Sequence, residues 1–113
     1  MRILATKLRN QFSSAYTVTL KNVIINGDKR GCTGFISRGD AIVYVNTELF
    51  GPQGYLYRTA EHLKDYTGGQ NRWAPDLESL VKRITDLLTA ESIRKRAGIP
   101  ADNLIVYTVG DSK

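Results

Sequence analysis

The sequence predicts one α+β domain, in which an antiparallel sheet carries two to three helices on one face. In the first half of the chain, apolar residues alternate with polar ones, as in strands that bury one face. In the second half they recur at helical spacing, as in helices that bury one side. The 113 residues contain no repeat and no linker, so a single domain is expected over residues 1–113. Strands followed by helices are typical of the α+β class.

The first strand is expected over residues 15–25. Apolar and polar residues alternate up to Lys21-Asn22, and three successive apolar residues then change the phase. A β-bulge near Lys21-Asn22 would explain this change, because a bulge inserts one extra residue into a strand. Asn26-Gly27 follows as a strong hairpin signal, since both residues tolerate positive φ. Residues 2–8 are a weaker candidate for a strand that precedes this hairpin.

Two more strands complete a three-stranded antiparallel meander. The chain is expected to return over residues 31–37, turn at residues 38–40 and run out again along residues 41–47. A further strand is expected near the C-terminus, where residues 104–109, LIVYTV, form a compact apolar run. This last strand is long enough to lie inside the sheet.

The helices are expected between these two groups of strands. One is predicted over residues 55–66, where several apolar residues share a helical face. A second follows Pro75, which suits a first helical position, and residues 77–88 give it a fuller apolar stripe. A third, short helix is predicted from Thr89, as its N-cap, to Gly98.

The net charge of +5 is concentrated in the first half of the chain. Residues 1–50 carry seven Lys or Arg against three Asp or Glu, whereas residues 51–113 carry nine against eight. Such a basic excess can attract phosphates or an acidic protein surface. The N-terminus lacks the apolar stretch of a secretory signal, and the longest apolar run, Ala41–Val45, is too short for a membrane span. These observations predict a cytoplasmic protein without membrane contact.

The stretch Lys29–Ser37, KRGCTGFIS, is close to the motif with which RNA-recognition domains stack bases. That motif needs a basic residue and a glycine, followed by aromatic residues at alternating positions of a central strand. Here Phe35 is the only ring, and Cys32 stands where another aromatic residue belongs. The expected strand also follows another strand, not a helix. We therefore reject that family and keep Lys29 and Arg30, at the hairpin tip, as separate candidates for nucleic-acid contact.

The sequence contains no motif for catalysis, for a cofactor or for a metal. Its only cysteine, Cys32, and its only histidine, His62, could pair as nucleophile and base, but no third residue or local signature accompanies them. One histidine and one cysteine cannot build a structural zinc site. Asp28 and Asp40 lie in successive turns about 20 Å apart, which excludes a paired-carboxylate site. A small Cys/His-dependent enzyme is kept as a minor alternative.

An expected loop over residues 65–75 holds the only tryptophan, Trp73, next to Arg72. Both residue types are enriched at binding hot spots. The alternative for Trp73 is packing against the first turn of the following helix. If residues 55–66 are helical, Tyr55 and Tyr57 cannot both face the core, so one of them is expected to be exposed.

An aromatic and basic surface is therefore expected over residues 50–75, with contributions from Arg58 and Lys64. Such a surface suits single-stranded nucleic acid, whose bases stack on rings, and it equally suits a protein interface. The sequence does not separate these two kinds of partner.

Together, these patterns predict a small non-catalytic binding protein that acts on nucleic acid or on a nucleic-acid-processing protein complex, as an adaptor or inhibitor. A protein-directed inhibitor without nucleic-acid contact is the alternative. The short, basic chain without a catalytic signature resembles small accessory proteins encoded by phages and mobile elements. No cofactor or metal is expected, and an open edge strand would allow a homodimer. The candidate binding residues are Lys29, Arg30, Tyr57, Arg72 and Trp73.

Overall fold

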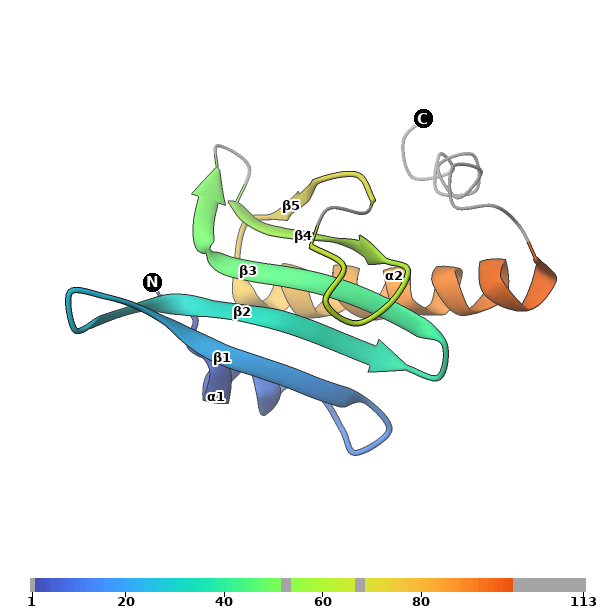
Figure 1. Ribbon diagram of the computed structural model, residues 1–113, viewed down its shortest axis with the longest axis horizontal. Helices are drawn as coiled ribbons and strands as arrows, with labels where there is room; N and C mark the ends of the chain where they lie inside the picture. The colour runs from blue at the N-terminus through green and yellow to red at the C-terminus, as the bar shows by residue number, and fades with distance from the viewer. Residues whose placement is uncertain (1, 52–53, 67–68, 99–113) are drawn as a thin grey trace.

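The computed structural model describes residues 2–51, 54–66 and 69–98 and contains an antiparallel sheet of five strands in sequential order. The long helix α2 runs behind the sheet, and the short helix α1 packs beside β1 (Figure 1). This arrangement confirms the α+β class and the antiparallel sheet. The elements are α1 (Ala5–Arg9), β1 (Thr17–Ile25), β2 (Asp28–Arg38), β3 (Ala41–Gly51), β4 (Gly54–Ala60), β5 (Arg72–Ala74) and α2 (Leu77–Ala97).

The first three strands form the expected meander. Asn26 and Gly27 have φ angles of 53° and 77° and make the predicted hairpin turn between β1 and β2. Gly39, with a φ of 60°, lies in the second predicted turn, between β2 and β3. The register of β1 against β2 shifts between Val23 and Ile24, just beyond the position predicted for a bulge.

Residues 54–60 form β4, and the helix predicted over residues 55–66 is wrong. Tyr55 and Tyr57 lie on the face toward α2, while Leu56 and Arg58 lie on the opposite face. Because residues two apart share one face of a strand, both tyrosines are buried. The expectation that one of them is exposed is therefore also wrong.

The helix α2 begins after Asp76, so Pro75 precedes the helix and does not occupy its first position. The Asp76 carboxylate accepts a hydrogen bond of 2.8 Å from the backbone N–H of Ser79, which caps the helix. This hydrogen bond holds the pKa of Asp76 below its ordinary value. The N-terminus of α2 is thus fixed directly after β5.

The second and third predicted helices are one continuous helix. Thr89 is not an N-cap, because its hydroxyl donates to the carbonyl of Thr85 one turn earlier in α2. The predicted end is confirmed, since Gly98 adopts the left-handed conformation with a φ of 72°. Residues 5–9 form α1, where a strand over residues 2–8 was a candidate. The strand expected over residues 104–109 lies outside the described residues.

The sheet buries side chains on both faces. The face toward the helices carries the main core, which includes Ile36, Val43 and Val45 from the strands and Leu80, Ile84 and Leu88 from α2. The opposite face carries a smaller cluster of Phe35, Tyr44, Leu56 and Ala60. Residues 61–66, here called the β4–β5 segment, cross in front of this second face (Figure 1). The segment covers only part of it and leaves a groove beside β1.

Candidate binding surfaces

The hairpin tip between β1 and β2 exposes both basic residues proposed from the sequence. Lys29 and Arg30 are solvent-exposed, as expected for a turn. Asp28 lies between two guanidinium groups, 2.8 Å from Arg2 and 4.0 Å from Arg30. The aspartate therefore offsets part of the positive charge at this tip.

Large apolar side chains are exposed at this end of the sheet, and sequence reasoning did not single them out. Ile24 and Phe50 leave 58% and 61% of their surface exposed, and Ile25 and Leu49 are exposed as well. The end of β3 lies close to the hairpin at Gly31. There is no room for a side chain at this position, because a Cβ on Gly31 would lie 2.6 Å from the backbone nitrogen of Glu48. We call this region the hairpin-end surface. It consists of Ile24, Ile25, Lys29, Arg30, Leu49 and Phe50.

A signal for these apolar side chains is present in the sequence. Val23, Ile24 and Ile25 are consecutive, and consecutive strand residues alternate between faces, so they cannot all point into the core. Phe50 is held at the surface by an edge contact with the ring of Tyr55, 4.8 Å between centroids. The apolar side chains are thus exposed within the strands β1 and β3.

Arg72 and Trp73 lie in the edge strand β5, at the other side of the sheet from the β1–β2 hairpin. Trp73 is half-buried, and it packs on the face away from α2, beside Leu56 and against Gly51. It is therefore not a staple for the first turn of α2. Its backbone carbonyl nevertheless anchors that helix by accepting a hydrogen bond of 2.7 Å from Arg83.

The structure separates the five candidate residues into distinct places. Lys29 and Arg30 lie together at the hairpin tip, whereas Arg72 pairs with Tyr57 between β5 and β4. Tyr57 belongs to the main core and is only 6% exposed, so a partner cannot contact it without a rearrangement. A binding role for Arg72 and Trp73 stays a prediction.

The groove between the β4–β5 segment and the open face of the sheet is lined by rings. The ring of Tyr66 contacts two buried aromatic rings, with centroid distances of 5.4 Å to Phe35 and 5.8 Å to Tyr44. Leu63, from the same segment, and Lys21, from β1, line the groove as well. We call this hollow, of about 560 Å³, the aromatic groove.

Arg58 holds the β4–β5 segment in place over the sheet. Its guanidinium group lies over the ring of Tyr44, 4.8 Å from the centroid, and donates to the backbone carbonyl of Tyr66. It also donates to the side chain of Asn71 at 2.8 Å. Arg58 therefore positions Tyr66 and is itself engaged inside the protein.

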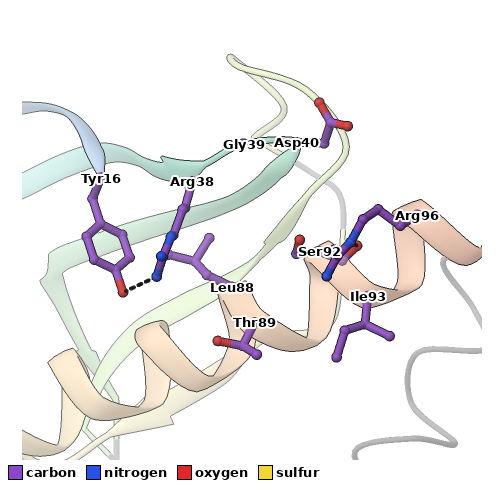
Figure 2. Close-up of a pocket in the computed structure, with 9 residues that line it drawn as sticks. All are labelled: Tyr16, Arg38, Gly39, Asp40, Leu88, Thr89, Ser92, Ile93 and Arg96. Atoms are coloured by element: carbon purple, nitrogen blue, oxygen red, sulfur yellow. Dashed lines mark hydrogen bonds between the residues drawn. The ribbon is translucent and has the colours of Figure 1, made fainter. Parts of the chain in front are cut away.

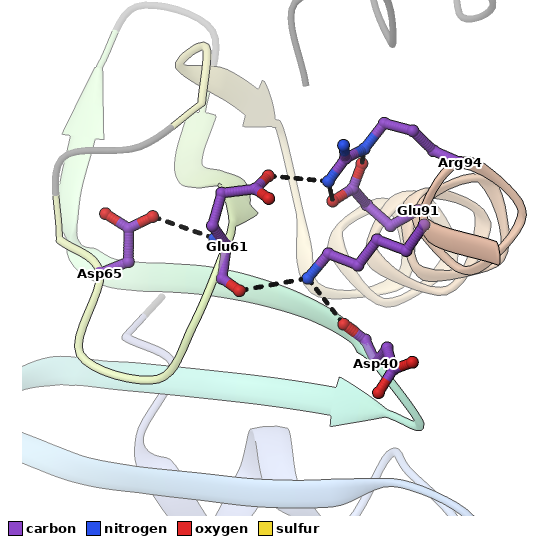
Figure 3. Close-up of polar contacts among 6 residues, drawn as sticks. Asp40, Glu61, Asp65, Glu91 and Arg94 are labelled. Carbon is purple, nitrogen blue, oxygen red and sulfur yellow. Dashed lines mark hydrogen bonds and ion pairs between the residues drawn. The ribbon is translucent and has the colours of Figure 1, made fainter. Parts of the chain in front are cut away.

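A buried ion pair on α2 fixes the start of the same segment (Figure 3). Arg94 donates to Glu91 at 2.8 Å and to Glu61, the first residue of the segment, at 2.7 Å. Hydrogen bonding to Glu91 raises the pKa of Arg94. Lys95 adds hydrogen bonds to the backbone carbonyls of Asp40 and Glu61, at 2.7 and 3.3 Å. The C-terminal half of α2 is thereby tied to both the β2–β3 turn and the groove wall.

A second hollow, of about 620 Å³, separates α2 from the start of β1 (Figure 2). Arg38 lies over the ring of Tyr16, 5.3 Å from its centroid, and donates to its hydroxyl at 3.4 Å. Arg96 reaches the hollow from α2. Asp40 also lines this hollow, whereas no Asp or Glu lines the aromatic groove among the described residues.

The structure does not bring Cys32 and His62 together. Cys32 is fully buried beside Thr47, and this burial raises the pKa of its thiol. His62 is exposed and donates from its ring to the backbone carbonyl of Leu63 at 2.9 Å. The two residues lie near opposite ends of the sheet, about 17 Å apart along its strands. The thiol–imidazole pair that a Cys/His-dependent enzyme requires is therefore not formed.

Within the residues that the structure describes, no cluster of three or more His, Cys, Asp or Glu side chains is placed to hold a metal ion. In the same part of the chain, neither helix has the length and apolarity needed to cross a membrane. No protein-family model, curated protein or solved structure matches this sequence.

Proposed function

We propose that the chain is a small non-catalytic binding protein, an adaptor or inhibitor that acts on a nucleic-acid-processing protein complex. The hairpin-end surface carries this proposal, because Ile24, Ile25, Leu49 and Phe50 are all exposed at the end of the sheet that carries Lys29 and Arg30. Contiguous apolar surface with a polar rim is typical of protein interaction sites. In this proposal Ile24 and Phe50 are the apolar anchors, and Lys29 and Arg30 form the rim.

The charge at this surface favours a protein partner over nucleic acid. Asp28 is paired with Arg2 and lies near Arg30, and Glu48 lines the same end of the molecule. These carboxylates weaken the attraction for phosphates, which dominates nucleic-acid binding. Association with a protein through the apolar anchors is expected to persist at high salt, since burial of apolar surface does not depend on charge.

The proposal also includes a cytoplasmic location and the role of a phage or mobile-element accessory protein. Nucleic-acid contact at the hairpin tip, without a protein partner, is the competing function from the sequence. The two differ in their dependence on salt and in whether nuclease treatment removes the bound material.

The test is affinity capture from a lysate of the source cells, with wild-type protein and with the variants Ile24→Ser and Phe50→Ser. Ile93→Ser is a matched control, because Ile93 is 55% exposed but lies on α2. We expect a protein that the wild type and Ile93→Ser retain through nuclease treatment and about 0.5 M salt. Its capture should fall about tenfold or more with either hairpin-end variant, as for hot-spot residues.

Two results would contradict this function. One is equal capture of every protein by the wild type and by both hairpin-end variants. The other is captured material that elutes at moderate salt and disappears after nuclease treatment, which would favour direct nucleic-acid binding at the tip. Thermal unfolding of each variant separates lost binding from lost folding.

A further inference from the structure

We infer that the aromatic groove binds single-stranded nucleic acid, with one base stacked on Tyr66 and neighbouring phosphates on Lys21 and Lys64. This inference goes beyond the proposed protein contact, because the groove shares no residue with the hairpin-end surface. Either proposal can therefore be wrong without affecting the other.

Tyr66 offers a ring for stacking that is both exposed and held. About half of the residue, 52%, is exposed, although its ring contacts Phe35 and Tyr44. The contact with Tyr44 is edge-on, with an interplanar angle of 83°. Arg58 holds the Tyr66 backbone by donating a hydrogen bond to its carbonyl. A ring fixed in this way loses little conformational freedom when a base stacks on it. Such stacking contributes about 1–3 kcal/mol per base.

The charge of the groove matches a phosphate backbone. Lys21 lies on β1 and Lys64 on the β4–β5 segment, so the two lysines line the groove from different walls. Both lysines are exposed, and among the described residues neither forms an ion pair. Thr33 and Asn46 add polar side chains that can hydrogen-bond to a base edge.

Lys64 occupies a strained position that glycine would take more easily. It has a φ of 70°, at the third position of a turn closed by a hydrogen bond of 3.2 Å from Asp65 N–H to the His62 carbonyl. The left-handed conformation costs a residue with a Cβ about 1–2 kcal/mol. Strain of this kind gathers at binding sites, where the side chain is needed in spite of it. Here the strained residue supplies one of the two charges in the groove.

The groove suits an unstacked strand better than a duplex. Its volume of about 560 Å³ falls in the range of pockets that enclose a small molecule. A base can reach Tyr66 only when it has left the stack of a double helix, as in the recognition of single strands. The ligand class is therefore single-stranded DNA or RNA, which share the base and phosphate chemistry used here.

The experiment measures fluorescence anisotropy of a labelled oligothymidylate, an oligouridylate and a duplex of equal length. We expect the wild-type protein to bind both single strands at about 50 mM salt and to bind the duplex more weakly. With two phosphates neutralised, the logarithm of the affinity should fall with the logarithm of the salt concentration at a slope of about −1.4. A difference in affinity between the two oligonucleotides identifies DNA or RNA as the preferred ligand.

Two variants test the residues. Tyr66→Leu keeps an apolar contact with Phe35 and Tyr44 but removes the stacking ring, so affinity should fall about 5- to 150-fold. Lys64→Gly removes one charge and the strain at once. It should weaken binding severalfold and reduce the salt slope by about 0.7, while the melting temperature stays the same or rises. Lys82→Gln is the matched charge control, since Lys82 is exposed on α2.

The inference is overturned if the wild-type protein binds neither oligonucleotide at low salt, or if it prefers the duplex. It is also overturned if Lys64→Gly and Tyr66→Leu bind as tightly as Lys82→Gln. Ile24→Ser, from the hairpin-end surface, should bind the oligonucleotides like the wild type. A loss in that variant would assign the nucleic acid to the hairpin tip.

Discussion

At the scale of single residues, Cys32 behaves as a small core residue whose thiol is protected by its surroundings. It is fully buried on β2, and the Thr47 hydroxyl lies 3.5 Å from its sulfur. An isolated cysteine without a catalytic signature usually packs as a hydrophobic residue, as Cys32 does here. Burial disfavours the charged thiolate, which is why the pKa of this thiol is raised.

This raised pKa predicts a loss of stability at alkaline pH. In the unfolded chain the thiol ionises around its ordinary pKa of 9.0, whereas in the folded protein it stays protonated to higher pH. The unfolded state therefore loses its proton first, and folding is disfavoured as the pH rises above that value. The free energy of unfolding should decrease by up to about 1.4 kcal/mol per pH unit in this window.

The measurement compares urea unfolding of the wild type and Cys32→Ala from neutral to alkaline pH. The substitution costs some packing at every pH, but this cost should shrink above the ordinary thiol pKa, because only the wild type has the thiol to ionise. Tyrosine and lysine titrations are common to both proteins and cancel in the difference. A difference that stays constant over the whole range would contradict the burial of the thiol.

At the scale of secondary structure, β4 shows why pattern reasoning failed for part of the sheet. Leu56, Ala60 and Leu63 fit a helical face, yet Tyr55 and Tyr57 fit a strand that buries both of its faces. Over seven residues the two periodicities do not exclude one another. Pairing with β3 and β5 decides between them, and these contacts are not visible in the local sequence.

The long helix α2 shows a similar limit. Three consecutive cations at residues 94–96, Arg-Lys-Arg, suggest a solvated face, but Arg94 is 5% exposed and Glu91 is fully buried. The contact between Arg94 and Glu91, three residues apart, could be expected from helix geometry, whereas the contact of Arg94 with Glu61, 33 residues earlier, could not. By contrast, the hairpin turn at Asn26-Gly27 was predictable, because a turn depends on its own residues.

The buried ion pair predicts a large loss of stability for Arg94→Ala. Removal of one partner leaves the Glu91 carboxylate buried without its charge partner, which should lower the free energy of unfolding by about 3–5 kcal/mol. Lys82→Ala is the matched control, because its pair with Asp86 is on the exposed side of the same helix. That variant should lose no more than about 0.5 kcal/mol.

Chemical denaturation of both variants checks this prediction. The double variant Glu91→Leu with Arg94→Met should recover much of the loss, because a well-packed apolar pair can replace a buried ion pair. Similar losses in Arg94→Ala and Lys82→Ala would show that Arg94 does not anchor the segment that carries Tyr66.

At the scale of the whole molecule, the two proposed surfaces arise from different parts of the same sheet. The hairpin-end surface is formed where β1, β2 and β3 extend beyond the helices, and the aromatic groove lies on the face that α2 leaves open (Figure 1). The sequence predicted an aromatic and basic surface over residues 50–75, with Lys64 as a member. It did not predict the groove, since Phe35 and Tyr44 come from strands far earlier in the chain.

The separation of the two surfaces predicts that their losses are independent. Ile24→Ser should lose the captured protein but keep oligothymidylate binding, and Lys64→Gly should do the reverse. In each assay, the double variant should then behave like the single variant that affects that assay, because distant sites without shared partners act additively. Any single substitution that weakens both activities in a folded protein would contradict two separate surfaces.

Co-elution distinguishes an adaptor from an inhibitor once the protein partner has been captured. An adaptor carries the labelled oligonucleotide and the partner at the same time, so the three components should elute as one complex in size-exclusion chromatography. An inhibitor that occupies the partner's own nucleic-acid site should instead release the oligonucleotide from the partner, and Ile24→Ser should abolish that release. Because the groove and the hairpin end lie apart, simultaneous occupation is the expected result for this fold.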